Sequence, residues 1–306
     1  MNQRRRATIG LFGVTLLWGG TFVWMKLALN AATVEIAEHG TTAVVGMMVS
    51  FRFLLASLSL LLVSSRARAA LFSKEDWQGG AILGTLMLFG YGIQMVGLET
   101  VTPSVSAFLT SLYVVFTAII GSKFAKHKLS RVMVMGALLA TFGAGFIDGM
   151  PHIVWGWGEI LTIISALFFA LHILATDNVT KRLDPIKIST TSFTFVALGA
   201  GIIGFLSAGE VSVASVITTE GVFNQLLLLG FLGTLVCLLL LNIYQKHFHP
   251  THAAIIYAFE PLWATIYALG LDLVEMSYWL LIGGSAVLFG NIIVEIDSHH
   301  QEEEEE

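Results

Sequence analysis

One apolar stretch of the sequence places an acid directly before a proline, at Glu260 and Pro261. Because Pro261 has no amide hydrogen, the helical carbonyl of Tyr257 loses its partner and the helix is expected to kink. Tyr257, Glu260 and Ala264 share one helix face, so a phenol, a carboxylate and a free carbonyl can converge. Three roles stay open for Glu260: a structural acid paired with a helix end, a ligand for a substrate amine, and a proton-coupling site. Pro261 is the predicted hinge.

Two cations, Lys26 and Arg52, also lie within hydrophobic runs. Each costs roughly 2.5 to 3.5 kcal/mol if it is central and unpaired. Lys26 is close to the expected outer end of its segment, where its long stem can reach the membrane interface. Arg52 lies about 13 Å from the end of its segment, so it should face protein or water. A structural partner and a substrate contact are both open for Arg52, and both cations are candidates for substrate binding.

Aromatic and polar side chains at helical spacing indicate further cavity residues. Helix periodicity places them on common faces, although Trp and Tyr also anchor helices at membrane surfaces. The groups are Trp18, Phe22 and Lys26; Tyr91 and Gln94; and Phe169, His172 and Thr176. The complete set of substrate-binding candidates is Glu260, Tyr257, Arg52, Lys26, Trp18, Tyr91, Gln94, Tyr113, His172 and Trp263.

The sequence offers little for other chemistry. It contains no GK[ST] phosphate loop, no HExxH pair and no GxSxG nucleophile elbow. His247, His249 and His252 cluster around Pro250, but carboxylates are absent nearby, so no metal is predicted. We therefore expect no enzyme activity, no cofactor and no nucleic-acid partner.

Composition indicates a membrane protein with many spans. Over 306 residues the mean hydropathy is +0.80, 56% of residues are hydrophobic and only 12% are charged. One soluble core cannot bury so much apolar surface. The single cysteine, Cys237, excludes an intramolecular disulfide. The first apolar run continues to Leu29 without a small-residue cleavage site, so we expect a spanning helix there rather than a signal peptide.

Ten hydrophobic segments are long enough to span a bilayer, which needs about 20 residues per helix. Their length excludes barrel strands, so the predicted fold is an all-α integral membrane protein. The predicted spans are 7–29, 43–65, 77–98, 102–125, 129–150, 154–178, 187–208, 222–247, 251–272 and 277–296.

The placement of charged residues supports this count. Apart from Lys26 and Arg52, the other 14 of the 16 Lys and Arg residues fall on one side when ten spans alternate with both ends inside. The opposite loops carry no Lys or Arg, and their acids are Glu35, Glu38, Glu99, Asp148, Glu210, Glu220, Asp272 and Glu275. By the positive-inside rule, the basic side and both termini are expected to be cytoplasmic.

The fourth and ninth segments resemble each other at an offset of 147 residues. Matches without a gap are Pro103/Pro250, Ala107/Ala254, Ile119/Ile266, Ser130/Ser277, Gly136/Gly283, Phe142/Phe289 and Gly143/Gly290, part of which composition alone can supply. The copies are five helices apart, an odd number, so they cross the membrane in opposite directions. We predict two inverted five-helix repeats, 7–150 and 154–296, and a disordered acidic tail, 297–306.

The two copies differ at one pair of aligned positions. The first copy has Tyr113 and Val114 where the second has Glu260 and Pro261. We therefore expect the charge and the kink in the ninth segment alone.

Four stretches follow one another in a specific order: WGGTFVWMKLAL (18–29), FRFLLASLSLLL (51–62), THAAIIYAFEPLWATIYALGL (251–271) and GGSAVLFGNIIV (283–294). In that order they resemble the first, second, ninth and tenth helices of the EamA-type transporters of the drug/metabolite transporter superfamily. The resemblance covers about residues 7 to 296. It implies a transporter of small metabolites in a bacterial inner membrane, often an exporter of amino acids or related compounds. It also implies a cavity between helices 1, 3, 4, 6, 8 and 9.

The predicted function is secondary transport by alternating access between the two repeats. The expected partners are a small-molecule substrate and the lipid bilayer, and a homodimer is left open. One alternative is a nucleotide-sugar or phosphorylated-metabolite exchanger, which needs more cations than Lys26 and Arg52 supply. The alternative from another class is a membrane-embedded enzyme or lipid-handling subunit, which needs an acid, a histidine and a metal set at one depth.

Overall fold

The computed structural model describes residues 3–125, 130–144, 156–208, 211–248, 256–257 and 259–303. All regular elements in these ranges are helical, which confirms the predicted all-α class. They are α1 (Gln3–Ala31), α2 (Thr33–His39), α3 (Thr41–Val63), α4 (Ser65–Ala70), α5 (Lys74–Leu98), α6 (Pro103–Thr110), α7 (Tyr113–Ala125), α8 (Arg131–Ala144), α9 (Trp157–Thr180), α10 (Pro185–Ala208), α11 (Val213–Thr218), α12 (Val222–Leu228), the π-helix η1 (Leu229–Val236), α13 (Cys237–Tyr244), the 3₁₀ turn η2 (Gln245–His247), α15 (Glu260–Gly270) and α16 (Tyr278–Glu303).

Seven helical segments among the described residues are long and apolar enough to cross a membrane, judged by length and composition. They are Arg6–Ala31, Thr41–Val63, Lys74–Leu98, Pro103–Gly121, Trp157–Thr180, Pro185–Ala208 and Val222–His247. α16 adds a shorter apolar stretch, Tyr278–Ile293. Parts of the predicted spans 129–150 and 251–272 lie outside the described residues. The chain is a multi-pass membrane protein, and the count of ten spans stays a prediction.

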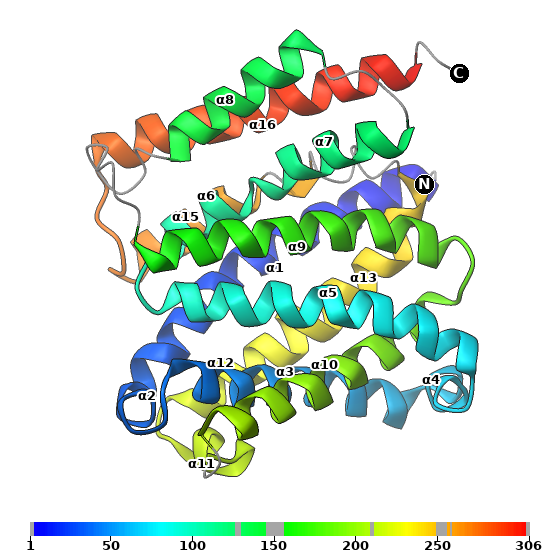
Figure 1. The fold of residues 1–306 in the computed structure, drawn as a ribbon, viewed down its shortest axis with the longest axis vertical. Coiled ribbons are helices and arrows are strands. Elements are labelled where there is room, and N and C mark those ends of the chain that lie inside the picture. The colour runs from blue at the N-terminus through cyan, green and yellow to red at the C-terminus, as the bar shows by residue number, and fades with distance from the viewer. Residues whose placement is uncertain are drawn as a thin grey trace.

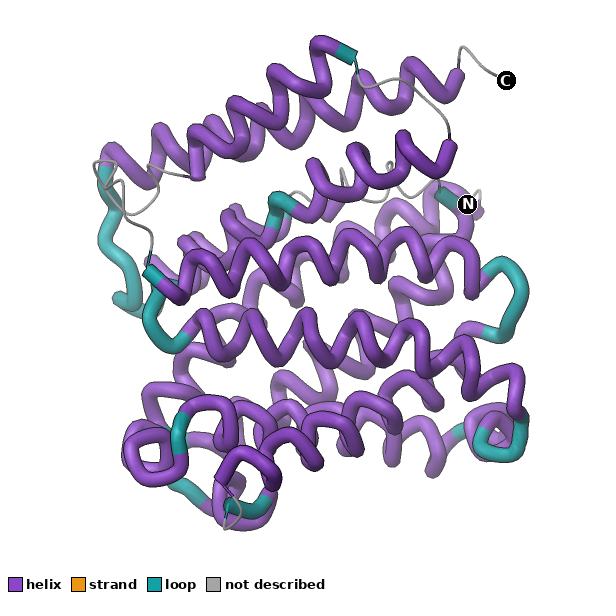
Figure 2. Tube along the Cα trace, viewed as in Figure 1, coloured by secondary structure: helices purple, strands orange, loops and turns teal. Residues whose placement is uncertain are grey.

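The helices are stacked side by side across the molecule (Figures 1 and 2). α8 and α16 form a pair at one end of the stack, and α3 and α10 lie at the other end. α5 and α9 run next to each other between these two pairs, with α1 and α13 behind them in the view of Figure 1. The cavity described below lies among these central helices.

Capping residues determine where two of the central helices begin. The Ser73 hydroxyl accepts a hydrogen bond from the amide of Asp76 and caps α5. The Thr102 hydroxyl does the same for the amide of Val105 at the start of α6, where Pro103 occupies the first turn. Side chains of this type satisfy amides that have no helical partner, and proline fits the first turn because it has no amide hydrogen.

Helices 147 residues apart in the sequence pack against one another. Between α3 and α10, Ser50 Oγ donates to the carbonyl oxygen of Ala197 over 2.8 Å, a contact between aligned positions. Near it the rings of Phe53 and Phe193 lie 5.9 Å apart. Between α8 and α16, Gly143 packs on Gly283 while Gly290 packs on Gly136. These reciprocal contacts are the pattern that a two-fold relation between the aligned helices produces.

The predicted boundaries of the two repeats lie only partly within the described residues. The junction between 150 and 154 lies outside them, so the repeat boundaries stay predictions. At the other end we expected 297–306 to be disordered, whereas α16 continues as a helix to Glu303. Glutamate is a good helix former, which accounts for a helix that extends into the acidic run.

Helix breaks occur in both copies of the repeated segment, which corrects the expectation of a break in the ninth alone. In the first copy, α6 ends before a turn at Ser111 and Leu112, and α7 begins at Tyr113. In the second copy Phe259 forms the turn and α15 begins at Glu260, with Pro261 in its first turn. Tyr113 and Glu260 are aligned positions, so the two new helices start in the same register.

The first break forms without a proline, and local hydrogen bonds together with a distant side chain stabilise its backbone: the amide of Val114 donates to the carbonyl oxygen of Ser111 over 3.0 Å. Asn291 Nδ2, from α16, donates to the carbonyl oxygen of Ser111 over 3.3 Å and to Ser111 Oγ over 3.0 Å. The Ser111 hydroxyl in turn donates to the carbonyl oxygen of Phe108. A carbonyl freed from a helix in the membrane must find such a partner.

The segment from α12 to α13 contains a π-helical stretch, η1. Within it Thr234 Oγ1 donates to the carbonyl oxygen of Leu229, five residues earlier, over 2.9 Å. The carbonyl oxygen of Gly233 accepts from Trp18 Nε1 on α1 over 3.2 Å. π-helical stretches occur frequently at functional sites, and this one fixes the orientation of a residue of the cavity.

Candidate functional site

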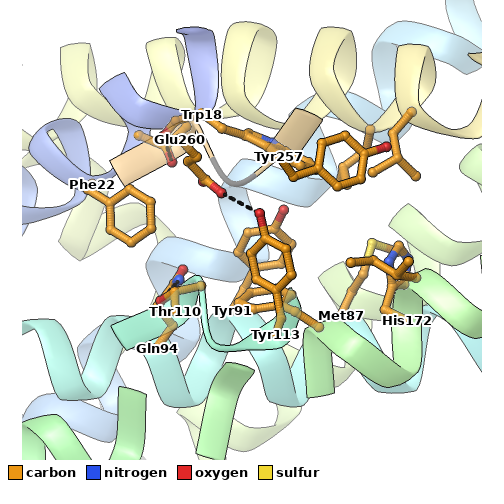
Figure 3. A pocket seen from close by; sticks show the side chains of 15 residues that line it. Trp18, Phe22, Met87, Tyr91, Gln94, Thr110, Tyr113, His172, Tyr257 and Glu260 are labelled. Atoms are coloured by element: carbon orange, nitrogen blue, oxygen red, sulfur yellow. Dashed lines mark hydrogen bonds between the residues drawn. The ribbon is translucent and has the colours of Figure 1, made fainter. Parts of the chain in front are cut away.

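A small cavity lies at the centre of the helix stack (Figure 3). Its volume is about 40 Å³, which accommodates a few water molecules. It is too small for an amino acid, so a ligand of that size requires the surrounding helices to move apart. The lining residues are Trp18, Thr21, Phe22, Met87, Tyr91, Gln94, Thr110, Tyr113, Phe169, His172, Ile173, Leu238, Leu241, Tyr257 and Glu260.

The lining comes from the six segments that the family resemblance implies. These are α1, α5, the broken α6–α7 segment, α9, α13 and the broken segment that leads into α15. Seven of the ten candidate residues are among the lining: Trp18, Tyr91, Gln94, Tyr113, His172, Tyr257 and Glu260. That these residues bind a substrate stays a prediction.

Glu260 and Tyr113 face each other across the cavity (Figure 3). The Tyr113 hydroxyl donates to Glu260 Oε2 over 3.4 Å, and both side chains are buried. Each is the first residue of a helix that follows a break, so the two breaks position these side chains next to each other in the cavity. A phenol from one copy of the repeat therefore meets a carboxylate from the other, at aligned positions.

Hydrogen bonds fix other polar residues around the cavity. Gln94 Nε2 donates to Thr110 Oγ1 over 3.0 Å, which links α5 to the end of α6. The Tyr257 hydroxyl donates to Gln245 Oε1 over 3.3 Å, and Gln245 Nε2 donates to the carbonyl oxygen of Ile173 over 2.8 Å. Both links reach from one lining segment to another, so they hold the cavity in its present shape.

His172 has a free hydrogen-bonding atom at the cavity. Its side chain is only 4% exposed, and Nε2 makes no hydrogen bond within the described part of the chain. The same holds for Thr176 Oγ1, one helical turn further along α9. In Figure 3 His172 lies well away from Glu260, next to Met87. Buried polar atoms are normally paired, so His172 Nε2 is an exception among the polar atoms of the described lining.

Arg52 lies behind the cavity wall instead of lining the cavity. Its Nε donates to Thr234 Oγ1 over 2.5 Å, and its NH2 group lies 3.5 Å from the carbonyl oxygen of Gly233. The guanidinium also lies over the ring of Tyr91, 4.5 Å from the ring centroid. The π-helix η1 thus supplies polar partners to a side chain that is 1% exposed, as expected for a cation at this depth.

Lys26 is likewise engaged outside the cavity. Its ammonium donates to the carbonyl oxygens of Leu98, Glu99 and Val101 over 3.0, 2.8 and 3.0 Å. These carbonyls lie at and beyond the C-terminus of α5, where the helix dipole favours a cation. Lys26 therefore caps a neighbouring helix.

Trp263 also lies outside the lining. It packs against α1 at Gly19, and its ring lies edge-on to Phe12, with 6.0 Å between centroids. This candidate residue thus belongs to the helix interface between α1 and α15.

Sequence reasoning missed several lining residues. Thr21, Met87, Thr110, Ile173, Leu238 and Leu241 were not among the candidates. Thr21 and Met87 could have been found by helical spacing, because they lie three residues after Trp18 and four before Tyr91. Leu238 and Leu241 have no polar or aromatic character that would distinguish them from lipid-facing leucines.

The histidine cluster lies only partly within the structure. His247 belongs to η2, whereas His249 and His252 lie outside the described residues. Among the residues that are described, no group of three or more His, Cys, Asp or Glu side chains could hold a metal ion.

The chain is similar to other proteins over most of its length. The EamA-like transporter family model matches residues 5–147 and 156–296. A protein of Archaeoglobus fulgidus named as an uncharacterized transporter is 27% identical over 296 residues, 96% of this chain and 87% of that protein. The uncharacterized transporter YoaV of Bacillus subtilis is 25% identical over 189 residues, 60% of this chain and 61% of that protein.

One solved crystal structure has the same fold. It superposes with a TM-score of 0.64 and covers 97% of this chain and 98% of its own, at 15% sequence identity. The shared architecture therefore extends over the whole molecule.

Proposed function

The chain belongs to the EamA-like transporter family, and from this premise we propose that it is a secondary transporter that exports small metabolites, such as amino acids or related compounds. The observation that carries the proposal is the buried cavity among membrane helices, with Tyr113 from one copy of the repeated segment facing Glu260 from the other. Binding sites of secondary transporters lie at such interfaces between repeats.

Alternating access between two inverted halves is the proposed mechanism. The reciprocal packing of α3 with α10 and of α8 with α16 supports two related halves. The cavity is too small for a metabolite, so substrate entry must separate α1, α5, α9 and α13. The breaks before α7 and α15 are where the lining segments can bend, because the backbone hydrogen-bond ladder is interrupted there.

The charge of the cavity favours this proposal over exchange of phosphorylated metabolites. Lys26 and Arg52 are both engaged outside the lining, and the described lining residues include no Lys or Arg. A phosphate group needs cationic partners or clustered donors. We place the protein in a bacterial inner membrane, as the family resemblance implies, and both termini in the cytoplasm, on the distribution of Lys and Arg.

Transport in proteoliposomes tests the proposal. The purified protein is reconstituted, loaded with unlabelled metabolite, and assayed for counterflow of labelled amino acids, amines, organic acids and nucleotide sugars. We expect accumulation of at least one amino acid or related compound above empty liposomes. Chemical conversion of a compound without movement across the membrane would contradict the proposal. A growth-protection screen in cells that overexpress the protein, challenged with toxic concentrations of amino acids and analogues, then tests the direction of transport.

A further inference from the structure

We propose that the cavity takes its substrate as an organic amine without an adjacent carboxylate, with the amine at Glu260 and a polar group of the substrate at His172. The inference rests on the proposed transport function and narrows its substrate class. It predicts that the protein transports amines in preference to the corresponding amino acids, which have the same amine and side chain and one additional carboxylate.

The charges around the cavity favour a cation. Glu260 is the one carboxylate among the described residues of the lining, which include no Lys or Arg. The two cations inside the hydrophobic runs already have polar partners, Lys26 at the end of α5 and Arg52 on η1. In an α-amino acid the amine and the carboxylate share one carbon, so an amine at Glu260 would bring a second carboxylate beside it. Two like charges at that distance repel strongly in a buried site.

Aromatic rings surround the position of the amine. Trp18 and Tyr257 are in edge contact, with 5.6 Å between ring centroids, and Tyr113 approaches Glu260 from the opposite side. Figure 3 shows Trp18, Tyr113 and Phe22 around Glu260, with the ring of Tyr257 further to the right. Aromatic faces attract ammonium groups, more strongly where water is excluded. An acid within a group of rings is therefore suited to a protonated amine.

The far end of the cavity supplies a hydrogen bond. His172 Nε2 is buried and has no partner within the described residues. Between His172 and Glu260 lie the rings of Tyr91 and Tyr113 and the side chain of Met87, all without formal charge. Once the lining helices have separated to admit it, a flat, apolar body with an amine at one end and a hydroxyl at the other can contact each of these groups.

Matched compound pairs test the inference. The pairs are tyramine with tyrosine, phenethylamine with phenylalanine, and tryptamine with tryptophan, each differing by one carboxylate. Counterflow of the six labelled compounds is measured in proteoliposomes. We expect at least one amine to move at least about ten times faster than its amino acid, since the carboxylate that the amino acid adds would lie next to Glu260, and such a like-charge contact costs at least that factor. Tyramine should exceed phenethylamine, and His172→Phe should remove that difference.

Variants of the acid complete the test. Glu260→Gln keeps the size of the side chain and its acceptor for Tyr113 but removes the charge, and it should lower amine transport at least about tenfold. Glu220→Gln, at an exposed acid outside the cavity, should leave amine transport unchanged. Folding of each variant is checked by size exclusion and melting temperature. If Glu260→Gln does not fold, Glu260→Asp is tested instead. Its side chain is shorter by one methylene, so the carboxylate lies further from the amine and the Michaelis constant for the amine should rise.

The outcomes separate the two proposals. If the amino acids move as fast as their amines in every pair, or if none of the six moves while other metabolites of the wider panel do, the inference is overturned and the transport function stands. Unchanged amine transport by a folded Glu260→Gln protein also overturns it. If no metabolite of the wider panel moves, the proposed function itself fails.

Discussion

The break between α6 and α7 and the break before α15 occupy the same register, yet they are stabilised by different means. Pro261 interrupts the second copy locally, because it has no amide hydrogen to donate. In the first copy Val114 stands at the aligned position and keeps its amide, which donates to the carbonyl oxygen of Ser111 over 3.0 Å, and Asn291 on α16 adds a second hydrogen bond to the same oxygen. The second break thus follows from the missing amide of a proline, whereas the first is a hydrogen-bonded turn that contacts between residues 180 positions apart reinforce.

The similar breaks place unlike groups in the cavity. Tyr113 donates a hydrogen bond and Glu260 accepts it over 3.4 Å. An approximately symmetric backbone therefore presents an asymmetric pair of side chains, and the charge comes from one half alone. The comparison teaches that helix geometry can be common to both copies while the chemistry is confined to one.

In the helix pair α8–α16, matching substitutions in the two copies should lower the free energy of unfolding by equal amounts. A Cβ on Gly143 would lie 2.6 Å from the carbonyl oxygen of Gly283, and one on Gly290 would lie 2.5 Å from that of Gly136. Gly143→Val and Gly290→Val should each lower the free energy of unfolding by about 3 kcal/mol through overpacking. Equilibrium unfolding in mixed micelles measures this. Gly13→Val, where a Cβ meets nothing within 4 Å, is the control. Clearly unequal losses at the two glycines would contradict the two-fold relation of this pair.

Removal of the distant donor tests how the first break is stabilised. Asn291→Ala removes both hydrogen bonds from α16 to Ser111, to its carbonyl oxygen and to its hydroxyl, and should lower the free energy of unfolding by about 2 kcal/mol, although the Val114 amide still donates to the carbonyl. Ser111→Ala keeps that carbonyl contact and loses only the hydroxyl, so its effect should be smaller. Melting temperatures in detergent compare the two variants. If Asn291→Ala is no less stable than Ser111→Ala, the turn does not depend on α16.

Removal of the proline tests the second break. In Pro261→Ala the new amide can donate to the carbonyl of Tyr257, so the helix can continue through Phe259 and turn Glu260 away from the cavity. We expect roughly tenfold slower transport, about 1.4 kcal/mol in the transition state, without loss of stability. Val114→Ala, at the aligned position of the first copy, should leave the α6–α7 turn in place. Transport at the parental rate by Pro261→Ala at equal expression would show that this break is not a hinge.

Removal of the hydrogen bond between Tyr113 and Glu260 should have the smallest effect on the protein among these substitutions. Tyr113→Phe keeps the ring and removes a hydrogen bond that is long at 3.4 Å. Transport should change by about threefold, which is roughly 0.7 kcal/mol, mainly in the Michaelis constant. Tyr257→Phe removes a hydroxyl that binds Gln245 instead of Glu260 and provides a comparison at the same cavity. A loss as large as that of Glu260→Gln would mean that the phenol has a role beyond orienting the carboxylate.

Much of the cavity could be predicted from helical spacing within single segments. Tyr257 and Glu260, three residues apart, share a face and do line the cavity, as do Tyr91 and Gln94. Lys26 and Arg52 could not be assigned in this way. Their partners are backbone carbonyls and a hydroxyl on other helices, and no spacing along one helix indicates which distant carbonyl is free.

Hydrophobic length, charge segregation and the 147-residue offset are properties of the chain itself. They sufficed for an all-α membrane protein with a repeated segment, because burial in lipid constrains every residue of a span in the same way. The tertiary structure decided what depends on pairing between segments: that Tyr113 faces Glu260, that the two cations of the spans lie outside the cavity, and that Ser111 forms a break without a proline. Each depends on a hydrogen bond or close contact between residues far apart in the chain, and such contacts form only when the helices pack against one another.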